Sequence, residues 1–336
     1  MVFHINDHAA YVSASIGIAF NDSSYIKPDD LVRHADVAMY EAKNTGKSRY
    51  AIFSDDMEQR AWKRLQIVST IRGAFDRDEF RVFYQPVVDL RTGIVREIEA
   101  LVRWDHPERG MLQPAEFLPL AGEIGLMATL DTWVLEQACR QAAEWQQRFP
   151  DFADLIVSVN VSAAFLQKPT LATIVSGILN AAELSPSSLR LEISEATMFD
   201  DIQRTLVAMD ELHALGIHIA IDDFGTGNTA LSYLRKLPVD SLKIDRSYMS
   251  DENDNPDAIS MTSAVVTLAK SLGVSITLEG IEHRHQMQLQ ARGCDLGQGF
   301  YFAKPLPVRQ IEAMLDASGD FQGHLDLAEP AGSGVL

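Results

Sequence analysis

The sequence predicts an α/β fold, a TIM-type (β/α)8 barrel with one antiparallel strand, preceded by a small α+β fragment. Apolar strand-like runs alternate with helical stretches over most of the chain after residue 79, which is the pattern of such a barrel. The first two runs are separated only by Arg91, Thr92 and Gly93, so this pair is expected to be an antiparallel hairpin. Polar side chains recur near the ends of these runs, where barrels of this type carry their functional sites.

Length and composition allow one large domain and a smaller part. The chain has 336 residues, of which 46% are hydrophobic. No apolar run reaches the roughly 18 residues that span a bilayer, and the first residues lack the charged and apolar regions of a signal peptide. Cys139 and Cys294 form no Cys-x-x-Cys pair, so neither a disulfide scaffold nor a zinc knuckle is expected. We expect a cytoplasmic location without membrane contact in this chain, and membrane attachment of a longer protein through upstream segments stays open.

The charge of the chain restricts its partners. A formal net charge of −18 argues against nucleic acid polymers and anionic lipid surfaces. If carboxylates cluster around divalent ions, the formal count exceeds the working charge. An anionic substrate would then need metal ions or a few well-placed cations in order to bind.

Residues 1–56 are expected to form an incomplete α+β domain. Residues 12–20 and 48–53 read as short strands, and residues 28–44 as an amphipathic helix. One helix and two strands make too small a core to stand as a domain. A connecting helix over 57–78 should follow, because apolar residues recur there at spacings of three and four.

The barrel is expected over residues 79–318, followed by a polar C-terminal tail over 319–336. Eight runs read as its strands: 80–89, 94–103, 155–161, 188–194, 217–223, 240–244, 274–279 and 295–299. An open doubly wound sheet is the alternative, but no Gly-x-Gly-x-x-Gly loop opens a first helix.

Alternation along the strands gives each one an apolar and a polar face. Val157 and Val159 share one face of their strand, whereas Ser158 and Asn160 share the other. The bulky faces suit packing under helices, so the smaller polar faces should line the barrel lumen. Six residues are expected to converge there at one mouth: Glu99, Asn160, Glu192, Asp222, Lys243 and Glu279.

This set of side chains favours a site for hard cations. Carboxylates and an amide oxygen, without His or Cys, select Mg²⁺ or Mn²⁺ over zinc. Adjacent Asp222 and Asp223 can serve two ions, with one carboxylate bridging. Two ions about 3.5–4 Å apart are suited to in-line displacement at phosphorus. The mutual repulsion of the two aspartates would then be offset by cations.

Seven short motifs follow one another in an order typical of a known family: EALVRW (99–104), SVNVS (158–162), LEISE (191–195), IDDFGTG (221–227), LKID (242–245), LEGIE (278–282) and GQGFYFAKP (297–305). Together they resemble the EAL-domain phosphodiesterases of bacterial signalling. Residues 12–53, with VSASIGIAF and ADVAMYEAKNTGKSRY, resemble the last third of a GGDEF domain. The GGDEF motif itself is absent, so the chain is not expected to make cyclic di-GMP.

The EAL resemblance implies hydrolysis of cyclic di-GMP to linear pGpG with two Mg²⁺ or Mn²⁺ ions. Ca²⁺ is expected to inhibit, because in an all-oxygen site the larger ion accepts looser geometry and activates water less well. The resemblance implies that the first ion is held by Glu99, Asn160, Glu192 and Asp222. The second is held by Asp222, Asp223 and Glu279, while Lys243 orients the attacking water. Lys243, Glu279, Asp223 and Glu99 are thus the implied catalytic residues.

The same resemblance implies the surroundings of the site. Arg103 would contact a substrate phosphate, and the nucleotide would be lined by Gln85, Leu101, Asp245, Gln298 and Pro305. Glu195 would brace the loop after Asp223, and Glu282 would support the metal ligands. That loop resembles the family's dimerisation loop, which implies a homodimer through the barrel.

The sequence departs from the family pattern at two places, and two other functions are considered beside the phosphodiesterase. The loop carries Asn228 and Thr229 where an aromatic and a serine are usual, and His283 stands where threonine is common. A catalytically silent cyclic di-GMP receptor is the first alternative, but such receptors usually lack an acidic ligand. An enolate-forming lyase with a Lys base is the second, and the motif order disfavours it.

Overall fold

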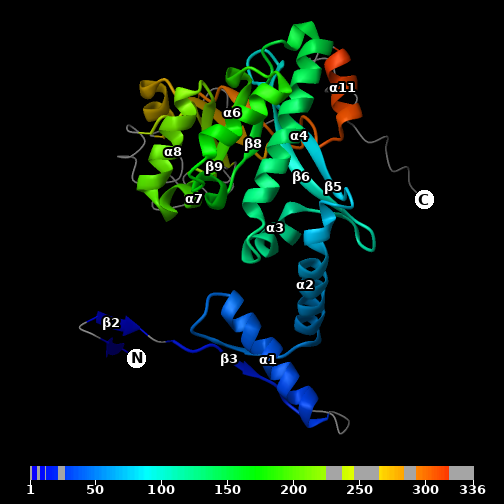
Figure 1. Cartoon of the computed structure of the whole chain (residues 1–336), viewed down its shortest axis with the longest axis vertical. Coiled ribbons are helices and arrows are strands. Elements are labelled where there is room, and N and C mark those ends of the chain that lie inside the picture. The colour runs from blue at the N-terminus through cyan, green and yellow to red at the C-terminus, as the bar shows by residue number, and fades with distance from the viewer. Residues whose placement is uncertain are drawn as a thin grey trace. The chain divides into compact units, whose positions relative to one another are not determined.

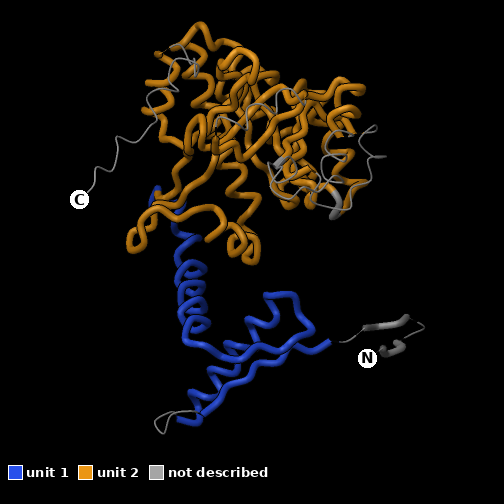
Figure 2. Tube along the Cα trace, turned by 180° about the vertical axis from the view of Figure 1, so that it is seen from behind, with its two compact units in different colours: residues 1–78 blue, residues 79–336 orange. Residues whose placement is uncertain are grey.

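In the computed structural model, the chain divides into two compact units, Met1–Asp78 and Glu79–Leu336 (Figure 2). The structure describes residues 2–5, 8–11, 13–21, 27–224, 237–245, 265–283 and 293–317. The C-terminal tail expected from residue 319 therefore lies outside the described residues. No helix in these ranges is long and apolar enough to cross a membrane.

The first unit contains two small sheets and two helices. Its elements are β1 (Val2–Ile5), β2 (His8–Tyr11), β3 (Ile16–Ile18), α1 (Pro28–Asn44), β4 (Tyr50–Ile52) and α2 (Asp55–Ala74). β1 and β2 form an antiparallel hairpin, whereas β3 and β4 pair in parallel. The strand expected over 12–20 is shorter in the structure, and the β1–β2 hairpin was not expected.

The strand β3 lies close against α1 at a glycine. A Cβ atom on Gly17 would stand 1.9 Å from the carbonyl oxygen of Ala35 and 2.2 Å from the backbone nitrogen of Met39. Only glycine allows the two backbones to approach in this way. The helices α1 and α2 are linked by Arg33, which contacts Glu58, and by Arg60, which lies 3.0 Å from Glu41.

The second unit contains the strands of a barrel and the helices around it (Figure 1). Its strands are β5 (Phe80–Asp89), β6 (Val95–His106), β7 (Gly110–Leu112), β8 (Ile156–Asn160), β9 (Leu189–Ser194), β10 (His218–Asp222), β11 (Ser241–Asp245), β12 (Ser275–Glu279) and β13 (Leu296–Gly297). The described helices are α3 (Pro114–Glu123), α4 (Met127–Arg148), α5 (Ala163–Leu166), α6 (Leu171–Ala182), α7 (Glu195–Asp200), α8 (Ile202–Ala214) and α11 (Val308–Asp316), with the 3-10 turns η1 (Pro150–Phe152) and η2 (Pro186–Ser188).

Strand pairing closes this sheet into the predicted barrel. The strand order is β5-β13-β12-β11-β10-β9-β8-β6-β7, and an additional β5–β6 pairing closes an eight-stranded ring that leaves β7 outside. β5 is antiparallel to both of its neighbours, β6 and β13, whereas the other pairs in the ring are parallel. The predicted fold, with one antiparallel strand, is confirmed.

The hairpin between β5 and β6 forms where the sequence predicted it. The carboxylate of Asp89 accepts hydrogen bonds from the backbone N–H groups of Arg91 and Thr92, at 2.9 and 2.8 Å. Gly93 follows with φ of +76°, a left-handed conformation that glycine adopts without strain. This turn reverses the chain and fixes the antiparallel register of β5 and β6.

Both faces of the parallel strands are buried, as in other helix-covered parallel sheets. Apolar residues such as Val157, Ile219 and Ile276 are 0% exposed on one face. On the other face, Ser158 and Lys243 are also buried, at 0% and 2%. The lumen is therefore a packed polar interior whose charged groups must be paired.

Candidate active site

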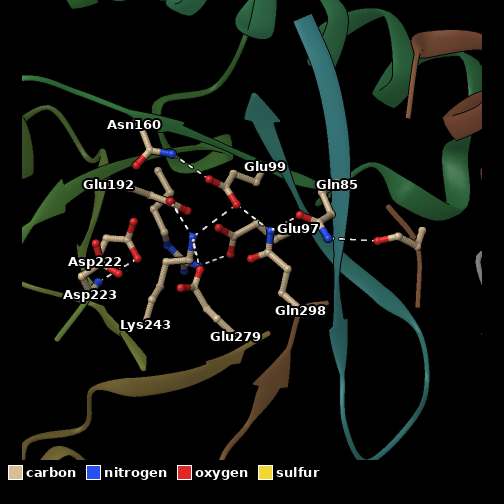
Figure 3. A network of polar contacts seen from close by, with 12 residues as sticks. Gln85, Glu97, Glu99, Asn160, Glu192, Asp222, Asp223, Lys243, Glu279 and Gln298 are labelled. Atoms are coloured by element: carbon tan, nitrogen blue, oxygen red, sulfur yellow. Dashed lines mark hydrogen bonds and ion pairs between the residues drawn. The ribbon is translucent and has the colours of Figure 1, made fainter. Parts of the chain in front are cut away.

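Six polar side chains converge at the carboxyl ends of the barrel strands, as the alternation pattern predicted (Figure 3). They are Glu99 on β6, Asn160 on β8, Glu192 on β9, Asp222 on β10, Lys243 on β11 and Glu279 on β12. Asn160, Asp222 and Glu279 are the last residues of their strands, so the ladder brings them to the rim of the barrel. The register places Asn160 opposite Glu192.

The ammonium group of Lys243 lies at the centre of the cluster. Its Nζ atom is 2.6 Å from Glu192 Oε2, 2.7 Å from Glu279 Oε1 and 3.4 Å from Glu99 Oε2. Lys243 and Glu192 are only 2% and 1% exposed. A buried ammonium is stable only beside anions, and these carboxylates provide them.

Glu99 is also held by two side-chain amides. Asn160 Nδ2 donates to Glu99 Oε1 at 2.6 Å, and Gln298 Nε2 donates to Glu99 Oε2 at 2.5 Å. Gln298 Nε2 also donates to Gln85 Oε1 at 3.1 Å, and Gln85 Nε2 donates to the carbonyl oxygen of Ala303 at 2.9 Å. This chain of amides links Glu99 to β5 and to the segment after β13.

The carboxyl groups around Lys243 differ in their pKa values. Burial acts to raise the pKa of Glu99, but Lys243 and the two amides outweigh it and hold this pKa below its ordinary value. Burial, together with the charge of Glu99, raises the pKa of Glu192 well above its ordinary value. Burial also raises the pKa of Glu279 to about 7. With all of these carboxyl groups ionised, the cluster would carry more negative charge than one ammonium compensates, so a further cation would stabilise the ionised form.

The residues present fit divalent cations. Ligand oxygens of Asp222, Asp223 and Glu279 lie within 4.8 Å of one another. Glu192 Oε1 is buried without a hydrogen-bond partner among the described residues, although its other oxygen binds Lys243. A buried carboxylate oxygen needs a donor or an ion. These oxygens are the hard ligands that Mg²⁺ and Mn²⁺ prefer.

The backbone turns sharply between the two adjacent aspartates. Asp222 ends β10, and Asp223 has φ of +54°, in the left-handed region that aspartate tolerates better than most residues. The N–H of Asp223 donates to Asp222 Oδ1 at 2.9 Å. Asp222 is half-buried and Asp223 is exposed. One carboxylate of the pair is therefore partly buried, whereas the other is open to solvent.

Arg103 lies on β6 beyond the carboxylates. It is buried, its Nη1 donates to the carbonyl oxygen of Val102 at 2.8 Å, and its Cζ lies 5.7 Å from the centroid of the Phe83 ring. Burial lowers the pKa of Arg103 from its ordinary value. Leu101, on the same face of β6, and Pro305, after β13, are half-buried.

The remaining predicted residues surround the cluster. Asp245 ends β11 opposite Glu279, and its side chain lies outside the described residues. Glu195 is buried at the start of α7, and Glu282 is exposed three residues after Glu279. The loop that Glu195 is expected to brace, with Asn228 and Thr229, lies outside the described residues. The roles of these residues stay predictions.

Two polar pairs near the site were not anticipated. Asp131 on α4 accepts hydrogen bonds from the N–H and the Oγ of Ser162, at 3.1 and 2.5 Å, which holds the segment after β8. Burial raises the pKa of Asp131 to about 6. Glu97 on β6 contacts Arg190 on β9 inside the barrel. Strand alternation places this second pair in the lumen, whereas nothing local in the sequence connects Asp131 with Ser162.

The fold and the site together define a class of protein, a TIM-type barrel whose strands end in an acidic cluster with oxygen atoms that could hold cations. The EAL domain family model matches residues 68–305, so the chain belongs to the EAL-domain family. Residues 1–49 match the family described as diguanylate cyclase, GGDEF domain. Both resemblances drawn from the motifs are confirmed.

Two named relatives align with most of the length of this chain. It is 38% identical over 312 residues to the bifunctional diguanylate cyclase/cyclic di-GMP phosphodiesterase MucR of Pseudomonas aeruginosa, covering 93% of this chain and 45% of MucR. It is 34% identical over 311 residues to the cyclic di-GMP phosphodiesterase PdeR of Escherichia coli, covering 92% of this chain and 46% of PdeR. The chain thus spans less than half the length of these relatives.

Solved structures of EAL domains resemble the barrel. The MucR phosphodiesterase in complex with cyclic di-GMP superposes with a TM-score of 0.69 at 38% identity, covering 73% of this chain and 99% of that one. The FimX EAL domain of Pseudomonas aeruginosa bound to cyclic di-GMP superposes with a TM-score of 0.65 at 26% identity, covering 71% of this chain and 96% of that one.

Proposed function

We propose that this chain hydrolyses one phosphodiester bond of cyclic di-GMP to give linear pGpG, as part of bacterial second-messenger signalling. The observation that carries the proposal is the acidic cluster, in which Lys243 lies within 3.4 Å of three carboxylates and Asp222 and Asp223 stand at the same rim. The relatives named as cyclic di-GMP phosphodiesterases support the substrate and the reaction.

The cluster would hold two Mg²⁺ or Mn²⁺ ions. The proposed ligands of the first are Glu99, Asn160, Glu192 and Asp222, and those of the second are Asp222, Asp223 and Glu279. Such a pair of ions supplies activation of a water and stabilisation of the leaving oxygen at phosphorus. Glu192 Oε1, which has no hydrogen-bond partner among the residues that the structure describes, supports cation binding at the first position, and the raised pKa of Glu279 supports it at the second.

Lys243 would orient the attacking water through its Nζ hydrogens. Its contact with Glu99, at 3.4 Å, is the longest of the three and therefore the weakest, so a water oxygen would replace this contact most readily. Arg103 would contact a substrate phosphate, since a guanidinium fork matches phosphate geometry. The nucleotide would be lined by Gln85, Leu101, Asp245, Gln298 and Pro305.

The surroundings would serve the same reaction. Glu195 would brace the loop after Asp223, and Glu282 would support the metal ligands from behind. We also propose a homodimer through the barrel and a cytoplasmic location, which sedimentation and cell fractionation would test.

The experiment is to incubate the purified chain with cyclic di-GMP and to follow pGpG by chromatography. Turnover is expected with Mg²⁺ or Mn²⁺, and none with excess chelator. Ca²⁺ should inhibit, because the larger ion accepts looser geometry and activates water less. Turnover that persists in chelator would contradict the two-ion site. Tight binding of cyclic di-GMP without any pGpG in Mn²⁺ would make the chain a receptor instead.

A further inference from the structure

A buried ion pair lies in the barrel lumen below the carboxylate cluster. Arg190 on β9 donates from Nη1 to Glu97 Oε2 on β6, and the two residues are only 7% and 3% exposed. Glu97 is seen in Figure 3 within the same polar interior as Glu99 and Lys243. The reaction proposed above assigns no role to either member of the pair.

The register shows what this pair connects. Glu97 lies two residues before Glu99 on the same face of β6, and Arg190 lies two residues before Glu192 on the same face of β9. β8 stands between these strands, so the Arg190 side chain crosses it to reach Glu97. Ser158 of β8 is in register with both Arg190 and Glu99, and its small side chain leaves room for that crossing.

Stability does not explain the pair. Replacing a buried ion pair by apolar residues of similar volume is often neutral or stabilising, because burial costs both charges their hydration. Hydrogen bonding around the pair is also incomplete, since Arg190 Nε and the Oγ of neighbouring Ser158 are buried without hydrogen-bond partners among the described residues. An apolar lumen would avoid both costs.

The position of Glu97 and Arg190 gives a functional reason for a charged pair in the lumen. The pair spans the two strands that carry Glu99 and Glu192, one pleat below these residues. An ion requires its ligands to be placed within roughly half an ångström, and residues behind the ligands provide that placement. A charge-assisted hydrogen bond has a narrower preferred length than an apolar contact, so this link between β6 and β9 restricts the separation of the strands that carry Glu99 and Glu192.

We propose that Glu97 and Arg190 are positioning residues that set the spacing of Glu99 and Glu192 for a divalent cation. The proposal rests on the proposed function, because it assumes that these two carboxylates bind an ion. Neither Glu97 nor Arg190 touches the ion or the substrate; they act through the strands that carry the ligands.

The test compares the double variant Glu97→Leu/Arg190→Met with wild type. It removes both charges, so the unfolding midpoint is expected to match or exceed that of wild type. Mn²⁺ affinity, measured by calorimetry without substrate, and kcat are each expected to fall about 10-fold to 100-fold, the scale for residues behind metal ligands. A surface pair, Arg148 and Glu312 at 2.9 Å, gives the matched control Arg148→Met/Glu312→Leu, which should change neither quantity.

Wild-type Mn²⁺ affinity in the folded double variant would overturn the proposal and leave the pair a structural feature. A second variant, Arg190→Lys, keeps the lumen charge but loses the guanidinium fork, and covers the case in which the double variant does not fold. It is expected to lower Mn²⁺ affinity about tenfold, and an unchanged affinity would again overturn the proposal. Failure of the proposed function is distinct, because wild type itself would then neither bind Mn²⁺ nor cleave cyclic di-GMP.

Discussion

The two compact units of this chain differ in how they treat charged and large apolar side chains on their sheets. In the barrel, Lys243 and Glu192 are almost completely buried, at 2% and 1% exposure. In the N-terminal unit, Ile16, Tyr50 and Ile52 on the strands β3 and β4 are 55%, 66% and 47% exposed. The barrel therefore encloses charges, whereas the smaller unit leaves large apolar groups at its surface.

Closure of the sheet explains the difference. β3 and β4 form a two-stranded sheet that has Gly17 against α1, while Ile16 and Ile52 lie on the other face. The barrel strands form a ring, so every lumen side chain is surrounded by others and charges must pair. A two-stranded sheet contributes little independent stability, whereas a closed ring supports a rigid polar site.

Removing charged groups from the enclosed site should give the largest effects. Glu99→Ala is expected to abolish hydrolysis by weakening Mn²⁺ binding, because its carboxylate serves the ion. Arg103→Ala should chiefly raise KM, by roughly tenfold, because its guanidinium serves the substrate phosphate. Kinetics beside Mn²⁺ calorimetry checks both variants. Equal losses in the two, with Mn²⁺ occupancy unchanged, would show that this division of roles is wrong.

Lys243→Ala tests whether the central cation of the cluster is catalytic. It should lower kcat at least roughly a hundredfold, the scale for one positioned catalytic group, while cyclic di-GMP binding in Ca²⁺ stays near wild type. Turnover in Mg²⁺ and calorimetry in Ca²⁺ separate the two effects. If binding collapses together with turnover, Lys243 is a structural counter-charge for the three carboxylates.

A matched pair of truncations compares the two kinds of sheet directly. Ile276→Ala removes a side chain that is 0% exposed on β12, and should lower the free energy of unfolding of the barrel by about 2–5 kcal/mol. Ile52→Ala, at 47% exposure on β4, should lower the free energy of unfolding of its own unit by less than about 1 kcal/mol. Denaturant titration measures both. Similar losses would mean that β3 and β4 are packed as firmly as the barrel.

The smallest effect is expected from removing most of the N-terminal unit. A chain that begins near Asp56 lacks β1 to β4 and α1 and should keep the melting temperature and turnover of the barrel, because the ring closes without those strands. Thermal unfolding and pGpG production measure this. A large drop in both would show that the N-terminal unit is an integral layer of the fold.

The sequence predicted which polar side chains face the lumen better than it predicted the strands of the N-terminal unit. Alternation along long strands is a local property, so Asn160, Lys243 and Glu279 could be assigned to the lumen without knowing which strands are neighbours. β13 has only two residues, Leu296 and Gly297, which is too short for alternation to show where the following Gln298 points. The β1–β2 hairpin likewise consists of strands too short to give a periodic signal.

Periodicity and turn chemistry are encoded by neighbouring residues, so the barrel, its antiparallel hairpin and the set of polar side chains at its mouth could be predicted from the sequence. Which of these groups meet depends on the closed fold. Closure of the ring brings Gln298 to Glu99, places Lys243 among three carboxylates, and lets Arg190 reach across β8 to Glu97. These contacts join residues up to 199 positions apart, and the geometry of the closed ring, not local pattern, brings such residues together.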